Sequence, residues 1–536
     1  MDAPVEVVEA KTSEPVSASV GKEELINASG HIQELDRNFN LWTLAGVGIT
    51  VGSTWPALGG SILVAIYNGG PPGVIYELIT VSLFYWIVAA CIAELASAIP
   101  SSGGVYHWAS VTPGKKWGRV VGFFAGYWNC LAWIFGSASM SSIGGNMCVQ
   151  MYAAMHPDFV PEAWHVFVAY IFITWIACAT VCLFNKAMPY TNSLGVFFIL
   201  TGVFITIVVV AVMPGRDGRP GHASDAFVWK EWTADIGYPN GFVFVAGMLN
   251  GAYSVGVPDC VSHLAEEIPF PSRNVPIAIA LQMIIGFVTA FAYLIAVLYS
   301  INDYDALFSS AFPIAEIYHQ ATGSSAGTVG LLFLIFICIF LTTIGTYITS
   351  GRTLWTLARD RATPFPSTLN RVHPTLNMPL NATLVCCAIV TILGAIYVGS
   401  TTAFNAFVGS FVVMSSSSYT AAILPHLLTR RKNIIPGPFW MKGWIGFLMN
   451  FIACAYMIVW IVIYCFPYAL PTDAQSMNYA SLIVGGFTVL VALWWFFGGP
   501  LKEDRYTGPR TAGEVHSKVE RLIVVDAAAG GAGATG

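Results

Sequence analysis

The sequence predicts an all-α polytopic membrane protein with about twelve transmembrane helices. Of its 536 residues, 56% are hydrophobic and only 10% are charged. These proportions lie far outside the range of soluble globular proteins. Long apolar runs recur along the chain, and two of them are interrupted at corresponding positions. Composition, span number and interruption together define the predicted fold class.

Twelve segments are long and apolar enough to cross a bilayer, which takes about 20 mostly apolar residues. They cover approximately residues 41–67, 74–99, 118–152, 163–184, 190–213, 241–264, 275–300, 326–350, 379–399, 403–426, 443–468 and 478–498. Each segment is predicted to be a helix. The first and third are longer than a straight crossing requires, so we expect them to tilt or break.

The distribution of Lys and Arg predicts that both termini face the cytoplasm. An even number of spans places the two termini on the same side of the membrane. Of the 24 Lys and Arg residues, only Arg216, Arg219 and Lys230 fall on the other side, which leaves 21 on the side of the termini. Basic residues favour the cytoplasmic side. The net charge of −5 comes largely from tails and loops and gives no reason to expect a nucleic-acid partner.

The two ends of the chain are predicted to be disordered cytoplasmic tails. Residues 1–38 are low in aromatic residues and rich in Glu, Ser and Val, and the segment 501–536 ends in small residues only. Such compositions do not bury enough apolar surface to offset the entropy of ordering. We therefore expect a single twelve-helix domain at residues 39–500.

The sixth predicted span contains a break at residues 256–259, which read Gly-Val-Pro-Asp. Pro258 lacks an N–H and clashes with the carbonyl four residues earlier, while Gly256 loosens the helix. Backbone groups left unpaired in lipid cost several kcal/mol, so a break at this depth must line a cavity or be buried in protein. Asp259 adds an ionisable group, which costs about 2.5 to 3.5 kcal/mol at a span centre. We expect Asp259 to be functional; capping of a restarted half-helix is the structural alternative.

The first predicted span is punctuated in the same way. Its apolar run LAGVGITVGSTWPALGG holds three interrupting glycines and three hydroxyl residues, which are Gly46, Gly48, Gly52, Thr50, Ser53 and Thr54. Two interrupted spans five apart are the pattern of a transporter built from inverted five-helix repeats, with its site at the midplane between the breaks. We place the repeats at about 41–213 and 241–426, followed by two extra helices at 443–498.

Three longer stretches carry a family resemblance. They are AELASAIPSSGGVYHWAS (93–110), HLAEEIPFPSRNVP (263–276) and SGRTLWTLARDRATPFP (350–366). They resemble signatures of the amino acid, polyamine and organocation superfamily, and within it the fungal permeases for choline, γ-aminobutyrate and other small amines. The resemblance covers about residues 35 to 500. It implies a leucine-transporter-like fold and alternating access, usually with proton-coupled uptake at the plasma membrane.

Charged residues gather at the expected cytoplasmic ends of spans two, six and eight. They are Glu94, Glu266, Glu267, Arg273, Arg352 and Arg359. Opposite charges at these ends can pair in one access state and separate in another, which predicts an inner gate. The alternative is a solvated rim, because ion pairs at a surface contribute only about 0 to 1 kcal/mol.

The family fold implies two kinds of substrate contact. Helix ends at the span-one break offer amides to a carboxylate, and the span-six break offers carbonyls to an ammonium. The corresponding candidates are Gly48, Thr50, Gly52, Ser53 and Thr54 for the first and Tyr253, Ser254 and Gly256 for the second. A quaternary ammonium such as choline would instead favour aromatic faces, each worth about 0.5 to 2 kcal/mol. Candidate faces are Trp55, Tyr127, Trp128, Trp133 and Tyr253, although aromatic packing is the alternative for each.

Two coupling ions are considered. Asp259 can take up a proton, because burial favours the neutral form of a carboxyl group. Sodium is the alternative, held between span-one carbonyls and the hydroxyls of Thr342, Thr343 and Thr346. Threonines in membrane helices more often bond the carbonyl four residues earlier. Resemblance to fungal carriers favours the proton.

Other functional classes find less support. The ten histidines are scattered and no phosphate loop, metal spacing or nucleophile motif appears, so neither an enzyme nor a cofactor is expected. A channel is disfavoured because no filter-like run or ring of charges is present. A carrier of a specialised metabolite and a transport-deficient nutrient sensor with the same fold remain the alternatives to an amine or amino acid transporter.

Overall fold

A computed structural model describes residues 31, 34, 35, 39–62, 66–234, 236–310, 312–399, 402–500, 505, 506, 508 and 509. The predicted disorder of the two tails falls mainly outside these residues. Where the tails are described, they contact the helices: His31 Nε2 lies 2.7 Å from a carboxylate oxygen of Asp360, and Arg119 Nε donates to the carbonyl oxygen of Tyr506 over 2.7 Å.

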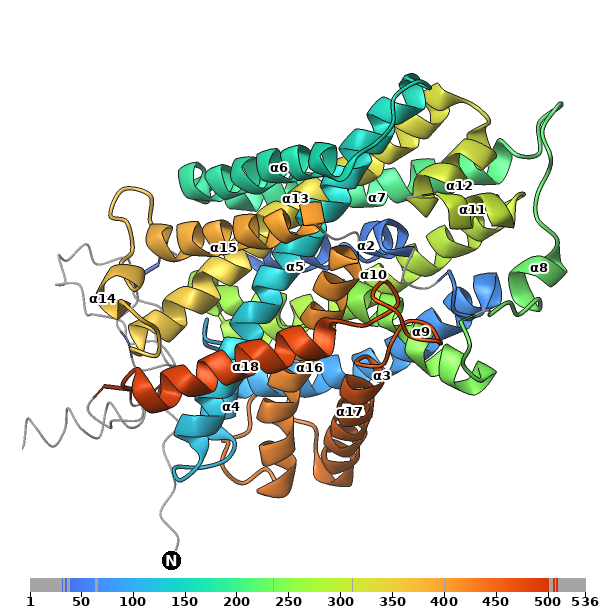
Figure 1. Ribbon diagram of the computed structural model, residues 1–536. Coiled ribbons are helices and arrows are strands. Elements are labelled where there is room, and N and C mark those ends of the chain that lie inside the picture. Colours follow the sequence, from blue (N-terminus) through green and yellow to red (C-terminus); the bar gives the residue numbers. More distant parts are fainter. Residues whose placement is uncertain are drawn as a thin grey trace, which may run out of the picture.

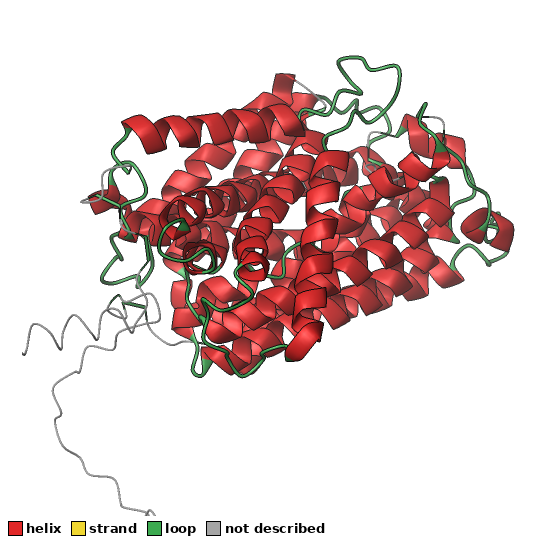
Figure 2. Ribbon diagram, turned by 90° about the horizontal axis from the view of Figure 1, so that it is seen from below, coloured by secondary structure: helices red, strands yellow, loops and turns green. Residues whose placement is uncertain are grey.

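The described secondary structure is helical, and Figures 1 and 2 show the helices packed side by side in a bundle. The helices are α1 (Leu41–Gly52), α2 (Thr54–Gly60), α3 (Gly70–Ala98), α4 (Val105–Val111), α5 (Gly118–Met155), α6 (Ala163–Leu183), η2 (Asn185–Ala187), α7 (Met188–Val212), α8 (Asp225–Trp229), α9 (Asn240–Val255), η3 (Cys260–Glu267), α10 (Pro271–Leu298), α11 (Tyr304–Ser309), α12 (Pro313–Thr322), α13 (Ser325–Arg359), α14 (Pro366–Leu369), α15 (Leu380–Gly399), α16 (Ala403–Leu428), α17 (Gly443–Ile463) and α18 (Ala480–Phe497). The labels α and η denote α-helices and 3-10 helices.

The helices confirm the predicted fold class of an all-α, multi-span membrane protein. Among the described residues, ten segments are long and apolar enough to cross a membrane. The broken pair α1 and α2 and the shorter apolar helix α15 coincide with the other two predicted spans. The third span, α5, is unbroken over 38 residues and packs against both α13 and α16.

The bundle has two chemically different ends. The "basic end" carries α4, α14 and the start of α1, and the "opposite end" carries α8, α11 and α12 (Figure 1). Basic residues gather at the first of these, namely Lys115, Lys116, Arg119, Lys186, Arg273, Arg359, Arg361, Arg371, Arg430, Arg431, Lys432 and Lys442. Backbone contacts join segments within each end: Phe39 N–H donates to Glu267 O over 3.2 Å at the basic end, and Ala223 N–H donates to Tyr299 O over 2.9 Å at the other.

The first span breaks at Ser53 and not at its glycines. Ser53 adopts a left-handed conformation with φ +36° between α1 and α2, whereas Gly46, Gly48 and Gly52 lie inside α1. The glycines provide room for a neighbouring helix. A Cβ atom at Gly48 would lie 3.2 Å, and one at Gly52 3.1 Å, from side-chain atoms of Gln282 on α10. Glycine in a membrane helix therefore marks close packing here.

The sixth span breaks where it was predicted to break. Helix α9 ends at Val255, and the chain resumes as the 3-10 helix η3 rather than as an α-helical half. Its first turns are closed by bonds between residues three apart, such as Ser262 N–H to Asp259 O over 2.9 Å. Gly256 is required sterically, because a Cβ atom there would lie 2.3 Å from the carbonyl oxygen of Ala252.

Gly345 of α13 tests the close packing of the two spans that meet at the first break. A Cβ atom at Gly345 would lie 2.4 Å from Val51 of α1, whereas one at Gly330 of the same helix meets no described atom within 4 Å. Overpacking a core typically costs about 1 to 3 kcal/mol. We expect Gly345→Val to lower the melting temperature of the purified protein well below that of Gly330→Val. Equal melting temperatures would contradict this packing.

Candidate functional site

The carboxylate of Asp259 is the centre of a buried hydrogen-bond network beside the break in the sixth span. Oδ2 accepts from Asn129 Nδ2 over 2.8 Å and from Trp133 Nε1 over 3.3 Å, and Oδ1 accepts from the hydroxyl of Tyr419 over 2.5 Å. The carboxylate makes no capping bond to the backbone of η3. Four side-chain contacts, His263 included, come from α5, α16 and η3, so Asp259 joins η3, which follows it directly, to two helices more than a hundred residues away.

His263 connects Asp259 to the loop before α4. Its Nε2 lies 3.2 Å from Asp259 Oδ2, and its Nδ1 lies 3.1 Å from the carbonyl oxygen of Ser102. Carbonyl and ionised carboxylate oxygens only accept hydrogen bonds. Both contacts can be hydrogen bonds only if the pair holds one proton beyond a neutral imidazole and an ionised carboxylate. The imidazole of His263 therefore lies between a carboxylate and a carbonyl oxygen, and the hydroxyl of Thr353 also lies 3.4 Å from Nδ1.

An aromatic cluster lies on α5, α9 and α16, and α5 and α16 also carry the Asp259 network. We define it as Tyr253 of α9, Phe411 of α16 and Trp133 of α5. The ring centroid of Phe411 lies 5.6 Å from that of Tyr253 and 6.2 Å from that of Trp133, both edge to face. The Tyr253 hydroxyl lies 2.7 Å from Ser139 Oγ on α5, which fixes the orientation of its ring. The cluster shares Trp133 with the Asp259 network.

The span-one candidates are placed against other helices. Gly48 and Gly52 are covered by Gln282, whose amide donates to Val257 O over 2.9 Å and so ties α10 to the sixth-span break. Thr50 Oγ1 donates to Asn192 O of α7 over 3.2 Å. Thr54 packs against Gly286 of α10, where a Cβ atom would lie 2.3 Å from its hydroxyl.

Two buried polar atoms near the breaks have no hydrogen-bond partner within the described part of the chain. They are the hydroxyl of Ser53 and Oδ1 of Asn129. Buried polar groups normally have a partner, so these atoms are available to a bound molecule or water. By contrast, Ser254 Oγ donates to Asn250 O on its own helix over 2.9 Å, and Gly256 O accepts from Tyr419 over 3.3 Å.

Three predicted aromatic faces lie elsewhere. Trp128 donates its indole N–H to Thr488 of α18 over 2.9 Å. It therefore lies on a different face of α5 from Asn129 and Trp133. Trp55 donates to Ile199 O of α7 over 3.1 Å. Tyr127 donates to Ala362 O, just after α13, over 3.1 Å. Of the five candidates, the structure brings together Trp133 and Tyr253.

Several site residues were missed by sequence reasoning. Asn129, Phe411, Tyr419 and Gln282 carry no local signal, because their partners lie far away in the chain. His263 had a signal, since it lies four residues after Asp259, a spacing that places two side chains on one face of a helix. Asn129 and Trp133 are also four residues apart, so they lie on one face of α5. Trp128 is five residues from Trp133 and lies on a different face.

The gate candidates form ion pairs at the basic end. Arg352 of α13 forms two hydrogen bonds with Glu267, and Arg359 Nη2 lies 3.1 Å from Glu266 Oε1. The side chains of Arg352 and Glu267 are each 2% exposed, so this pair is no solvated rim. Arg273 is exposed and makes no ion pair with a described residue.

Glu94 pairs with a partner that the sequence did not suggest. Arg431, which follows α16, donates to Glu94 Oε1, and Asn450 Nδ2 of α17 lies 3.4 Å from Oε2. The guanidinium of Arg431 also lies 4.2 Å from the ring centroid of Trp440. Glu94 therefore ties α3 to the connection between α16 and α17, apart from the Glu266 and Glu267 pairs.

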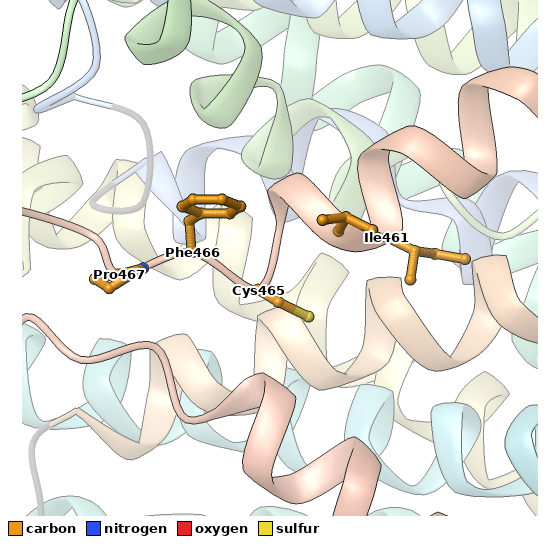
Figure 3. Close-up of a pocket in the computed structure, with 5 residues that line it drawn as sticks. Ile461, Cys465, Phe466 and Pro467 are labelled. Atoms are coloured by element: carbon orange, nitrogen blue, oxygen red, sulfur yellow. The ribbon is translucent and has the colours of Figure 1, made fainter.

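A pocket at the end of α17 is separate from this site. It has a volume of about 450 Å³ and is lined by Ile461, Val462, Cys465, Phe466 and Pro467 (Figure 3). The lining side chains are apolar and carry no hydrogen-bonding group that would orient a polar substrate. The breaks in the first and sixth spans remain the better candidate site.

Comparisons with known proteins agree with this architecture. A family model described as amino acid permease matches residues 39–488. The choline transporter of Saccharomyces cerevisiae is 33% identical over 483 residues, which cover 88% of this chain and 83% of that protein. The transmembrane transporter swnT of Metarhizium robertsii is 29% identical over 461 residues, covering 84% and 90%. The crystal structure of the Eremococcus coleocola manganese transporter aligns with a TM-score of 0.50 at 14% identity, covering 84% of this chain and 92% of that one.

The fold and the paired breaks define a transmembrane transporter with a leucine-transporter-like fold. The chain belongs to the amino acid permease family, as the model match and the identity to the yeast relative show. The resemblance drawn from the three sequence stretches is confirmed. The protein is a multi-pass transporter of an amino acid, choline or a similar amine, and it is not an enzyme.

The Arg352–Glu267 pair provides a test of the basic-end contacts. Removing one partner of a buried ion pair typically costs about 3 to 5 kcal/mol, because the other charge stays buried and unpaired. We expect Arg352→Gln to lower the melting temperature strongly. The double variant Arg352→Gln with Glu267→Gln should recover most of the loss, and Arg273→Gln serves as the exposed control. A double variant as unstable as the single one would contradict the pairing.

Proposed function

We propose that this protein is a proton-linked carrier of a small quaternary amine of the choline type. The observation that carries the proposal is the buried Asp259–His263 pair next to the aromatic cluster, at the break between α9 and η3. An exchangeable proton and a cation-binding aromatic surface thus meet at one break. The yeast relative named as a choline transporter supports the choice of substrate class.

The proton belongs to the pair rather than to Asp259 alone. Asn129, Trp133 and Tyr419 already donate to the carboxylate. Donors to a carboxylate favour its ionised form, so we assign the additional proton to the pair as a whole. Loss of that proton leaves a buried negative charge whose imidazole neighbour is neutral. Burying an uncompensated charge is costly, which favours opening of the surrounding helices.

Sodium coupling has less support. Thr342 Oγ1 donates directly to Thr50 O of the first span over 2.8 Å. To bind a cation between them, both oxygens would have to direct lone pairs at the cation. Their separation would also have to exceed the length of a hydrogen bond. Thr343 Oγ1 donates to Ile339 O and Thr346 Oγ1 to Thr343 O, each over 2.8 Å. All three hydroxyls therefore serve as donors to helix carbonyls.

Aromatic faces support a quaternary amine over an amino acid. Gly48 and Gly52, the predicted amide donors to a carboxylate, are covered by Gln282, and Thr50 points to α7. Tyr253, Phe411 and Trp133 offer π faces and edges beside a buried carboxylate instead. A quaternary ammonium cannot donate N–H bonds and is attracted to such faces.

We place the basic end in the cytoplasm, with both termini there, and the carrier in the plasma membrane. Positively charged segments favour the cytoplasmic side. The Glu266–Arg359 and Glu267–Arg352 pairs then close the inner side in this state. His263 connects the proton to this closure, because Ser102 accepts from His263 and its hydroxyl also accepts from Glu266 N–H over 3.2 Å.

Uptake of labelled choline and labelled γ-aminobutyrate into permease-deficient yeast tests the proposed function. We expect saturable choline uptake that a protonophore abolishes. Uptake of γ-aminobutyrate alone would instead support a substrate site at the span-one break that binds a carboxylate. Surface expression without uptake of either compound would favour a specialised-metabolite carrier or a sensor.

Asp259 and His263 carry the coupling prediction. We expect Asp259→Asn and His263→Asn each to reduce uptake more than about tenfold and to abolish its dependence on external pH, since neither variant keeps the pair. The exposed Asp217→Asn serves as a control for charge and surface expression. Normal pH-dependent uptake by Asp259→Asn at the cell surface would refute the assignment.

Tyr253 carries the substrate prediction. Loss of one aromatic face, worth about 0.5 to 2 kcal/mol, corresponds to a rise in KM of about 2-fold to 30-fold. We expect this rise for choline in Tyr253→Leu but not in Tyr253→Phe, which keeps the ring. Trp128→Leu, on the α18-facing side of α5, should leave the KM unchanged. If Tyr253→Phe raised the KM as much as Tyr253→Leu, the hydroxyl and not the ring would bind choline, which would contradict the proposed role of the aromatic cluster.

A further inference from the structure

Glu77 is a buried carboxyl group that the site described above does not use. It lies on α3, seven residues after the helix start at Gly70 and therefore about 10 Å from the opposite end. The residue is 1% exposed. Neither Oε1 nor Oε2 has a hydrogen-bond partner within the described part of the chain. It differs in this from Glu94, Glu266 and Glu267, which are all paired.

The carboxyl group of Glu77 packs against a glycine of the broken sixth span. A Cβ atom at Gly247 of α9 would lie 2.1 Å from Glu77 Oε1 and 2.5 Å from Oε2. One turn later, a Cβ atom at Gly251 would lie 2.4 Å from Val81 of α3. The two glycines, four residues apart, let α3 and α9 approach closely, and this approach removes water from the carboxyl group.

Among the described residues, no ion pair joins Glu77 to a Lys, Arg or His side chain. The hydroxyl of Tyr464, just after α17, lies within the electrostatic influence of Glu77. From the α8 side, Asp225 accepts from Tyr299 over 2.7 Å and is engaged there. From α9, Asn250 Oδ1 lies 2.5 Å from Ser61 Oγ, and its Nδ2 has no described partner. The closed packing therefore accommodates the neutral acid and penalises the carboxylate.

We propose that Glu77 is a second proton-binding site, on the side of the sixth-span break that faces the opposite end. It is protonated while α3 and α9 are packed together, and it exchanges its proton with the opposite aqueous side when α9 moves away and water reaches it. The Asp259–His263 pair lies on the other side of the same break. This inference rests on the proposed proton-linked transport and adds a separate station for the proton within it.

Infrared difference spectroscopy of the purified protein in lipid at about neutral pH tests the protonation directly. The carbonyl stretch of a carboxylic acid is resolved from the bands of a carboxylate. We expect an acid band in the wild type that is lost in Glu77→Gln, kept at a shifted position in Glu77→Asp, and unchanged in the exposed control Glu231→Gln. Because Asp259→Asn should keep the band, the result does not depend on whether Asp259 and His263 couple transport.

The spectra and uptake together decide the proposal. An acid band that is equally strong in wild type and Glu77→Gln, or absent from the wild type, would overturn it. So would a carboxylate band of Glu77 that responds to Na⁺ or K⁺, which would assign the residue to a metal cation. In uptake assays we expect Glu77→Gln to reduce the change of uptake rate with external pH by about threefold or more. Glu231→Gln should retain the pH dependence of the wild type. An unchanged pH dependence in Glu77→Gln would also overturn the proposal.

Discussion

The structure depends on enclosing a carboxylate and a broken backbone at membrane depth. Lipid offers no hydrogen bonds, so every group freed by the break must find a partner in the protein. Asp259 meets this requirement through Asn129, Trp133, His263 and Tyr419. A buried hydrogen-bond network orders the elements that form it. The positions of α5, α16 and η3 around the break follow from this constraint.

The same network provides a physical connection between the site and the basic end. His263 contacts the loop at Ser102, and that loop lies so close to η3 that a Cβ atom at Gly104 would be 2.8 Å from Ser262 Oγ. Glu266 and Glu267 end η3 and hold two arginines of α13. Under the proposed coupling, a change of charge at the break would act on a short 3-10 helix whose end carries the proposed gate. The hydrogen-bond geometry of such a helix is poorer than that of an α-helix, which suits it to move.

Glycines contribute mainly by allowing close approach rather than by interrupting helices. Gly48 and Gly52 admit Gln282, and Gly247 admits the carboxyl group of Glu77. These contacts bring polar side chains against helix backbones in the interior, where water is excluded. The first break centres on a left-handed serine, and in the sixth span Gly256 acts together with Pro258.

The sequence by itself determined the all-α multi-span class, the basic end and the break at residues 256–259, and it singled out Asp259 as a candidate. These properties are local, because apolar length, charge distribution and a proline within a span act on neighbouring residues. It misplaced the first break, since a glycine in an apolar run fits both a break and a close contact. Only the tertiary structure decided which side chains surround Asp259, which charges pair and which aromatic residues face one another. Except for His263, those choices depend on packing between elements at least 85 residues apart, and no local pattern records the partner.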